Sequence, residues 1–284
     1  MRTLGFGAHP AGLTTLFFTE LWERFSFYGL QALLILYLVL PVEEGGRGYS
    51  VAHAAMIYGN YTMAVYLLSI LGGYLADRLL GAARTVLMGG VTIVAGHICL
   101  AIGPTGSLYT GLGCIAVGTA LLKPNVTSLV GSLYARDDPR RDAGFSLYYM
   151  GINIGAFAAP LVCGYLAQGE GFREWLAMSG MDPKRSWHWG FGAAAMGMFV
   201  GLLVFAMRWR KWNEPIANDV PSVRSEAISQ WQHGGRRFAA IAFFCACAIV
   251  FFAMSKQAGS SLNLFGDRFT RTELFLYGDR KSVV

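Results

Sequence analysis

Long apolar stretches separated by short polar segments recur along the whole chain. A helix needs roughly 20 apolar residues to cross a bilayer, and each stretch is about that long or longer. This pattern predicts an all-α membrane protein with a group of six spans and, after a longer polar segment, a seventh span. The predicted spans cover residues 14–40, 51–76, 84–103, 108–130, 144–167, 187–208 and 238–265.

The polar segment before the last span is basic and contains Pro215, Pro221, Gly234 and Gly235. Proline and glycine clusters between apolar stretches mark loops and linkers. The pattern therefore divides the chain into four parts: a six-helix transmembrane bundle at 1–208, a cytoplasmic linker at 209–237, a seventh transmembrane helix at 238–271 and a tail at 272–284.

Two acids and a base interrupt the first apolar stretch. A charged side chain at membrane depth is costly, so such residues normally face a protein interior or an aqueous cavity and mark an ion or substrate path. Spacings of three and four residues place side chains on one helical face, and this face carries Glu20, Glu23, Arg24, Phe27, Tyr28 and Gln31. The pattern indicates proton or carboxylate chemistry. Alternatively, Glu23 and Arg24 form a buried pair that only fixes helix packing.

Composition and charge agree with a membrane protein. Hydrophobic residues make up 54% of the chain, charged residues 14%, and the net charge is +6. Loop charges favour a cytoplasmic N-terminus, because basic residues are enriched in cytoplasmic loops, and no nucleic-acid-binding motif competes with this interpretation. The basic residues then inside are Arg2, Arg78, Arg84, Arg136, Arg140, Arg141, Arg208, Arg210, Lys211, Arg224, Arg236 and Arg237; those outside are Arg47, Arg173, Lys184 and Arg185.

Cysteine and histidine give no sign of a metal centre. The five cysteines fall within apolar spans without a C-x-x-C pair, and the five histidines are dispersed without an H-E-x-x-H pattern. The sequence also contains no visible arrangement of nucleophile, base and orienting residue. We therefore expect no metal site, no catalytic residues and no enzymatic activity.

Several local motifs of the chain point to one known family. The stretch from Glu20 to Gly29 contains an E-x-x-E-R-F motif within the first span, and the segment from Gly72 to Arg84 joins the second and third spans. Further motifs lie in the fourth, fifth and seventh spans, at residues 122–125, 145–155 and 257–265. Together these motifs resemble the first-helix motif, the loop between helices two and three, the fourth-helix lysine segment, the fifth-helix signature and the seventh helix of the proton-dependent oligopeptide transporter (POT/PTR) family of the major facilitator superfamily.

The resemblance implies roles for individual residues. It implies that Glu20, Glu23, Arg24 and Lys123 couple proton uptake to peptide binding, and snorkelling remains an alternative for Lys123. Phenol and amide groups that would hydrogen-bond the peptide are supplied by Tyr28, Gln31, Tyr66 and Asn153, although each could instead make an interhelical hydrogen bond. The resemblance implies a cytoplasmic gating role for Asp77, Arg78 and Arg84. For the two arginines there is an alternative, because basic residues are common in cytoplasmic loops without any gating role.

The implied activity is proton-coupled symport of di- and tripeptides by alternating access. The expected partners are peptides, protons and the lipid bilayer. No cofactor and no nucleic acid are expected, and the protein should be a multi-pass, monomeric component of the inner (plasma) membrane. Two alternatives stay open: a transporter of the same fold for nitrate or another anion, and a peptide sensor that does not transport. Concentrative peptide uptake would separate transporter from sensor.

Three departures from the family pattern affect these expectations. Gln31 stands where many members have an arginine, and Lys256 stands where the seventh helix commonly has a glutamate, which reverses the local charge. The family also has two six-helix halves, so the chain resembles an N-terminal half plus the start of the C-terminal bundle. Because residues 279–284 match the translation of a sequencing adapter, we expect that the gene continues and that Thr272 onward is partly or wholly foreign.

Overall fold

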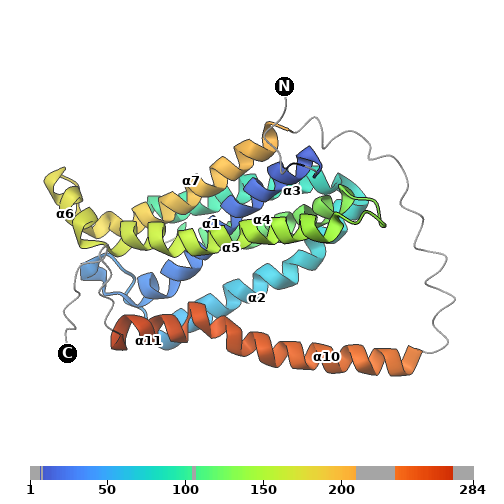
Figure 1. Cartoon of the computed structure of the whole chain (residues 1–284). Coiled ribbons are helices and arrows are strands. Elements are labelled where there is room, and N and C mark those ends of the chain that lie inside the picture. Colours follow the sequence, from blue (N-terminus) through green and yellow to red (C-terminus); the bar gives the residue numbers. More distant parts are fainter. Residues whose placement is uncertain (1–6, 8, 104–106, 209–233, 271–284) are drawn as a thin grey trace.

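Helices account for every regular element that the computed structural model describes, which covers residues 7, 9–103, 107–208 and 234–270. Six long helices pack together, and short helical segments join or flank them (Figure 1). The long helices are α1 (Ala11–Val39), α2 (Val51–Leu75), α3 (Ala82–Ile102), α4 (Ser107–Ser132), α5 (Arg141–Gln168) and α7 (Ser186–Ala206). The short ones are η1 (Val42–Glu44), η2 (Ala76–Leu80), α6 (Glu170–Met178) and η3 (Pro183–Arg185). The all-α fold predicted from the sequence is confirmed.

Six segments among the described residues are long and apolar enough to cross a membrane. They are Val51–Leu80, Ala82–Ile102, Ser107–Ser132, Arg141–Gln168, Pro183–Ala206 and Ala239–Phe269. The predicted first span is not among them, because α1 contains Glu20, Glu23 and Arg24 and is less apolar than the six segments. It has 29 residues, however, and therefore extends about 43 Å, enough to cross a bilayer. The chain is thus a multi-pass membrane protein.

Helix α1 is the most enclosed helix of the bundle. It packs along α5 and α7, while α3 packs on α4 and α7, and α2 packs on α4. Because neighbours cover most of its circumference, α1 buries residues on several sides, among them Leu16, Leu30 and Leu34, which are fully inaccessible to solvent. A polar residue on the covered part of α1 therefore faces protein, as the sequence pattern predicted for the charged stripe.

Glycines let the backbones of neighbouring helices approach closely. Gly89 of α3 faces Gly118 of α4, and a Cβ atom added at either one would lie 2.6 Å from the carbonyl oxygen of the other. Gly96 and Gly111 face each other in the same way. A Cβ atom added at Gly96 would lie 2.7 Å from the Gly111 carbonyl oxygen, and one added at Gly111 would lie 2.9 Å from the Gly96 carbonyl oxygen. Small residues at interfaces are a general feature of membrane helix packing, and they account for part of the chain's glycine content.

The charged part of α1 is held against α5 by two further glycines. Gly151 and Gly155 lie one turn apart, and the Cβ positions of both point at the backbone of α1. At Gly151 the added atom would lie 3.0 Å from the Phe17 carbonyl oxygen, and at Gly155 it would lie 3.0 Å from the Phe25 backbone nitrogen. The glycines of the fifth-helix signature thus set how closely α5 approaches the charged stripe.

We expect Gly155→Ala to lower the free energy of unfolding by about 1–3 kcal/mol, the usual cost of overpacking a tight interface. The reason is that the added methyl group meets backbone atoms of α1, which cannot swing aside as a flexible side chain could. Thermal or denaturant unfolding in detergent measures the effect. Gly113→Ala is the matched control, since a Cβ atom there meets nothing within 4 Å; equal losses in both variants would contradict the close-approach explanation.

The seventh span is interrupted, whereas the sequence predicted a continuous helix over 238–265. It consists of α10 (Gly234–Ser255), a short 3-10 segment η5 (Lys256–Gly259) and α11 (Ser261–Phe269). From residue 239 to 255, α10 is exposed, and it lies away from the bundle in Figure 1. Instead, α11 docks on α1, where the Asn263 amide donates a 2.8 Å hydrogen bond to the Ala32 carbonyl oxygen. Most of the predicted linker (209–233) and the predicted tail (272–284) lie outside the described residues.

Candidate functional site

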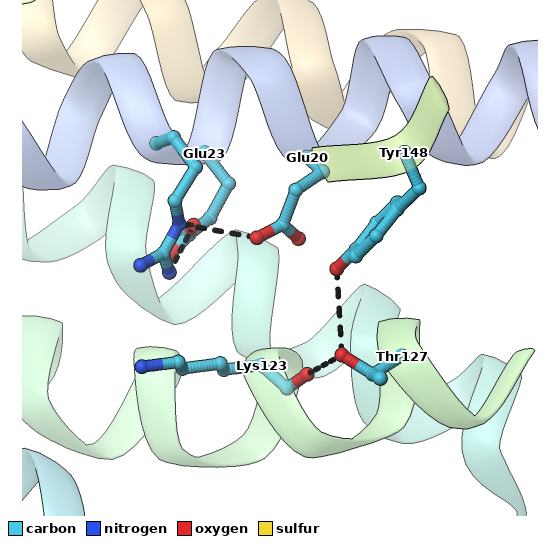
Figure 2. Close-up of polar contacts among 6 residues, drawn as sticks. Glu20, Glu23, Lys123, Thr127 and Tyr148 are labelled. Atoms are coloured by element: carbon cyan, nitrogen blue, oxygen red, sulfur yellow. Dashed lines mark hydrogen bonds and ion pairs between the residues drawn. The ribbon is translucent and has the colours of Figure 1, made fainter. Parts of the chain in front are cut away.

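Two carboxylates share one guanidinium group in the middle of α1. Glu20, Glu23 and Arg24 are 1%, 0% and 4% exposed. Oε1 of Glu20 lies 3.2 Å from Nε of Arg24, and Oε2 of Glu23 pairs with both Nε and Nη2 of the same arginine. Figure 2 shows both contacts as dashed lines. The four-residue spacing from Glu20 to Arg24 is one helical turn, so local helix geometry alone places this pair together.

This charged cluster has one more acid than base, and part of its hydrogen-bonding capacity is unused. Phe27, one turn further along, lies under the guanidinium, with the Arg24 Cζ atom 4.8 Å from the ring centroid. Oε2 of Glu20 and Oε1 of Glu23 are buried without a hydrogen-bond partner in the described part of the chain. Burying such an oxygen unpaired is costly, and binding one proton would neutralise the cluster's excess negative charge. The cluster therefore has the chemistry of a candidate proton-binding site.

A hydroxyl pair connects α4 and α5 beside this cluster. Tyr148 of α5 is 1% exposed, and its hydroxyl group lies 3.4 Å from Oγ1 of Thr127 in α4. Thr127 in turn donates a 3.3 Å hydrogen bond to the Lys123 carbonyl oxygen. In Figure 2 the Tyr148 ring stands next to the Glu20 carboxylate, with its hydroxyl group directed toward Thr127. Sequence reasoning missed both hydroxyl groups, although Tyr148 lies within the fifth-helix signature.

Lys123 lies on the α4 face that is turned toward the two glutamates (Figure 2). Its Nζ atom is 5.0 Å from the centroid of the Tyr66 ring on α2, and it forms no ion pair with a carboxylate among the described residues. The side chain is half-buried. The structure thus brings all four proposed coupling residues to one region, with Lys123 next to the cluster but not bonded to it.

The proposed peptide-contact residues are not all together. Tyr28 and Gln31 are half-buried on α1, and Tyr66 is 42% exposed on α2, beside Lys123. Asn153 lies on an exposed face of α5, in an open hollow lined by residues of α5 alone: Ser146, Tyr149, Met150, Asn153, Ile154 and Phe157. It makes no hydrogen bond with the other three candidates in the ranges described. Three candidates therefore border the charged region, and the fourth faces outward from another helix.

The three proposed gating residues lie at the end of the bundle where α2 leads into α3. Asp77 and Arg78 belong to η2, and Arg84 lies in the first turn of α3, after Gly81, which has a positive φ of 77°. All three charged side chains are exposed. They form no ion pair with one another within the described ranges. Their location is separate from the buried charges on α1.

Residues 83–228, about half of the chain, match the family model described as POT family. The chain belongs to the POT family. This confirms the resemblance inferred from the motifs. The chain is 48% identical over 223 residues to the "Uncharacterized transporter YclF" of Bacillus subtilis (strain 168), a match that covers 78% of this chain and 42% of that protein. It is 44% identical over 204 residues to a "Di-/tripeptide transporter" of Lactococcus lactis subsp. lactis (strain IL1403), a match that covers 70% of this chain and 38% of that protein.

Solved structures of POT transporters share the fold. A mutant of a peptide transporter POT in complex with sulfate matches with a TM-score of 0.65 at 43% identity, over 87% of this chain and 47% of that one. The same mutant in complex with alafosfalin matches with a TM-score of 0.66 at 41% identity, and the match covers 93% of this chain and 50% of that chain. The chain thus spans about half the length of these structures and about two fifths of the curated relatives.

Proposed function

We propose that this protein is a secondary transporter, not an enzyme, that carries di- and tripeptides across the membrane together with protons. The observation that carries the proposal is the buried pair of carboxylates on one guanidinium, because it offers a proton-binding group inside a membrane-spanning bundle. Relatives at 44% identity named as di-/tripeptide transporters support the choice of substrate. Alternating access requires no cofactor beyond the coupling protons.

Within this proposal, Glu20, Glu23, Arg24 and Lys123 couple proton binding to transport. Proton uptake by one glutamate would weaken its hold on the guanidinium and so change the charge that the region presents to a peptide. The substrate-contact residues would be Tyr28, Gln31, Tyr66 and Asn153. Asp77, Arg78 and Arg84 would act in gating at the end of the bundle. Helices α1 to α7 would form one half of the transporter, and α10 would begin the second.

The proposed topology places the N-terminus in the cytoplasm and the protein, as a monomer, in the inner (plasma) membrane. Arg78, Arg84, Arg140 and Arg208 support the orientation, because they flank helix ends at the side of the bundle where α1 begins. Arg208 also donates a 2.9 Å hydrogen bond to the Ala11 carbonyl oxygen at that end. Basic residues favour the cytoplasmic side.

Proteoliposome uptake tests the proposal. The protein expressed from the complete gene should accumulate radiolabelled dialanine above the external concentration when an inward proton gradient is imposed, and a protonophore should abolish the accumulation. Nitrate uptake without peptide uptake would favour the anion-carrier alternative. Dialanine binding without uptake would favour the sensor alternative, and either result would overturn peptide symport.

A further inference from the structure

Two lysines from distant parts of the chain share one aromatic ring. Nζ of Lys123, on α4, lies 5.0 Å from the centroid of the Tyr66 ring, and Nζ of Lys256, at the start of η5, lies 5.5 Å from the same centroid. Both lysine side chains are half-buried, and the ring belongs to α2. Three elements that are far apart in sequence thus bring two ammonium groups to the same place.

These two ammonium groups leave the region with more positive than negative charge. Glu20 and Glu23, the acids that α1 contributes to this region, are both paired with Arg24. Neither lysine forms an ion pair with a carboxylate in the part of the chain that the structure describes. Like charges repel, and more strongly away from bulk water, while the face of a tyrosine ring offsets only a small part of this cost. Glu20 and Glu23 against Arg24, Lys123 and Lys256 give two negative and three positive side chains, so the described region has one excess positive charge.

The position of Lys256 is fixed by its neighbours. Three residues further on, Gly259 packs so tightly that a Cβ atom there would lie 2.7 Å from Nε2 of Gln31. Asn263, in the following turn, is hydrogen-bonded to the Ala32 carbonyl oxygen at 2.8 Å. Both contacts tie this part of the seventh span to α1. Because the helix is interrupted at Lys256–Gly259, the lysine is held near Tyr66 while α10 lies away from the bundle.

We propose that Lys123, Lys256 and Tyr66 form an anion subsite that selects peptides carrying an acidic side chain in addition to the terminal carboxylate. The inference rests on the proposed peptide transport. A neutral peptide is a zwitterion without net charge, whereas an acidic peptide has a second carboxylate and one net negative charge, which matches the excess positive charge of the region. Each ammonium group can donate several hydrogen bonds to carboxylate oxygens, and such charge-assisted hydrogen bonds are the stronger kind. A basic peptide would instead add one net positive charge to the region.

Peptide competition against radiolabelled dialanine tests the selection, with the protein from the complete gene in proteoliposomes. Alanyl-glutamate should compete about tenfold more strongly than alanyl-lysine, the effect of one charge-assisted hydrogen bond. Lys256→Gln should remove most of this difference by weakening alanyl-glutamate much more than alanyl-lysine. Lys256→Arg should keep the preference, because the charge remains, and Lys256→Glu should invert it in favour of alanyl-lysine.

Lys184→Gln is the matched control, because Lys184 is exposed in η3, outside the bundle. This variant should retain the wild-type preference. Dialanine uptake without any charge preference, or an equal loss for all three peptides in Lys256→Gln, would overturn the acidic-peptide subsite and leave peptide transport intact. If inorganic anions fill the subsite, dialanine binding will depend on chloride without a preference for alanyl-glutamate, which would also overturn it. Absence of all peptide uptake would overturn both proposals.

Discussion

Glu23→Gln is expected to abolish concentrative peptide uptake while peptide exchange across the membrane continues. Glutamine has nearly the same shape as glutamate and can still accept a hydrogen bond from Arg24, the partner of Glu23 in the buried cluster. It cannot bind or release a proton in the transport cycle, so an inward proton gradient can no longer drive accumulation. The internal peptide concentration should stop at the external one, whereas the wild type exceeds it.

Two transport assays on the same proteoliposomes separate these outcomes. Gradient-driven uptake reports proton coupling, and counterflow of labelled against unlabelled dialanine reports binding and alternating access without net proton movement. Glu43→Gln is the matched control, because Glu43 is exposed in η1 and should retain both activities. Unchanged accumulation by Glu23→Gln would remove Glu23 from the coupling role. Loss of counterflow as well would indicate that the carboxylate is needed for structure or binding.

The parts of the site that depend on local helix geometry could be predicted from the sequence. The spacing of Glu20, Glu23 and Arg24 fixes them on one face of any α-helix, so their proximity follows once the helix is recognised. Their burial also follows, because charged side chains at membrane depth avoid lipid. The structure agrees on both points.

Contacts between helices could not be predicted in this way. The position of Lys123 over Tyr66 depends on how α2 packs on α4, which no pattern within either helix specifies. The contact between Tyr148 and Thr127 was missed for the same reason, since the two hydroxyl groups meet only because α5 and α4 lie next to each other there. The placement of Asn153 could not be predicted either, because membership in a motif does not reveal that its side chain lies on an exposed face of α5, apart from the other candidates.

The interruption of the seventh span was also missed. Its apolar residues form one run long enough for a single helix, and average hydropathy does not register a local change from α-helix to 3-10 helix. The available signal was Gly259 followed by two serines, which weakens helix propensity. The change matters for function because it sets the position of Lys256, the residue that departs from the family pattern and lies on the same ring as Lys123.

Arg24→Met is expected to lower the free energy of unfolding by about 3–5 kcal/mol, the usual cost of removing one partner of a buried ion pair. The substitution leaves the carboxylates of Glu20 and Glu23 buried without their shared guanidinium. The loss should be smaller at acidic pH, where protonation removes the unpaired charges. Denaturant unfolding in detergent at neutral and acidic pH measures both effects.

Arg140→Met provides the matched control for loss of an arginine ion pair. Arg140 pairs with Asp138 at 2.7 Å in the loop between α4 and α5, and its side chain is 49% exposed; an exposed pair contributes little, so no measurable change is expected. Replacing Glu20, Glu23 and Arg24 together with methionine should restore much of the stability, because apolar substitutes for a buried charge network are often neutral or stabilising. If the cluster served only to fix helix packing, this triple variant would also retain proton-driven uptake. If the cluster binds the coupling proton, the triple variant will be stable but will not accumulate peptide.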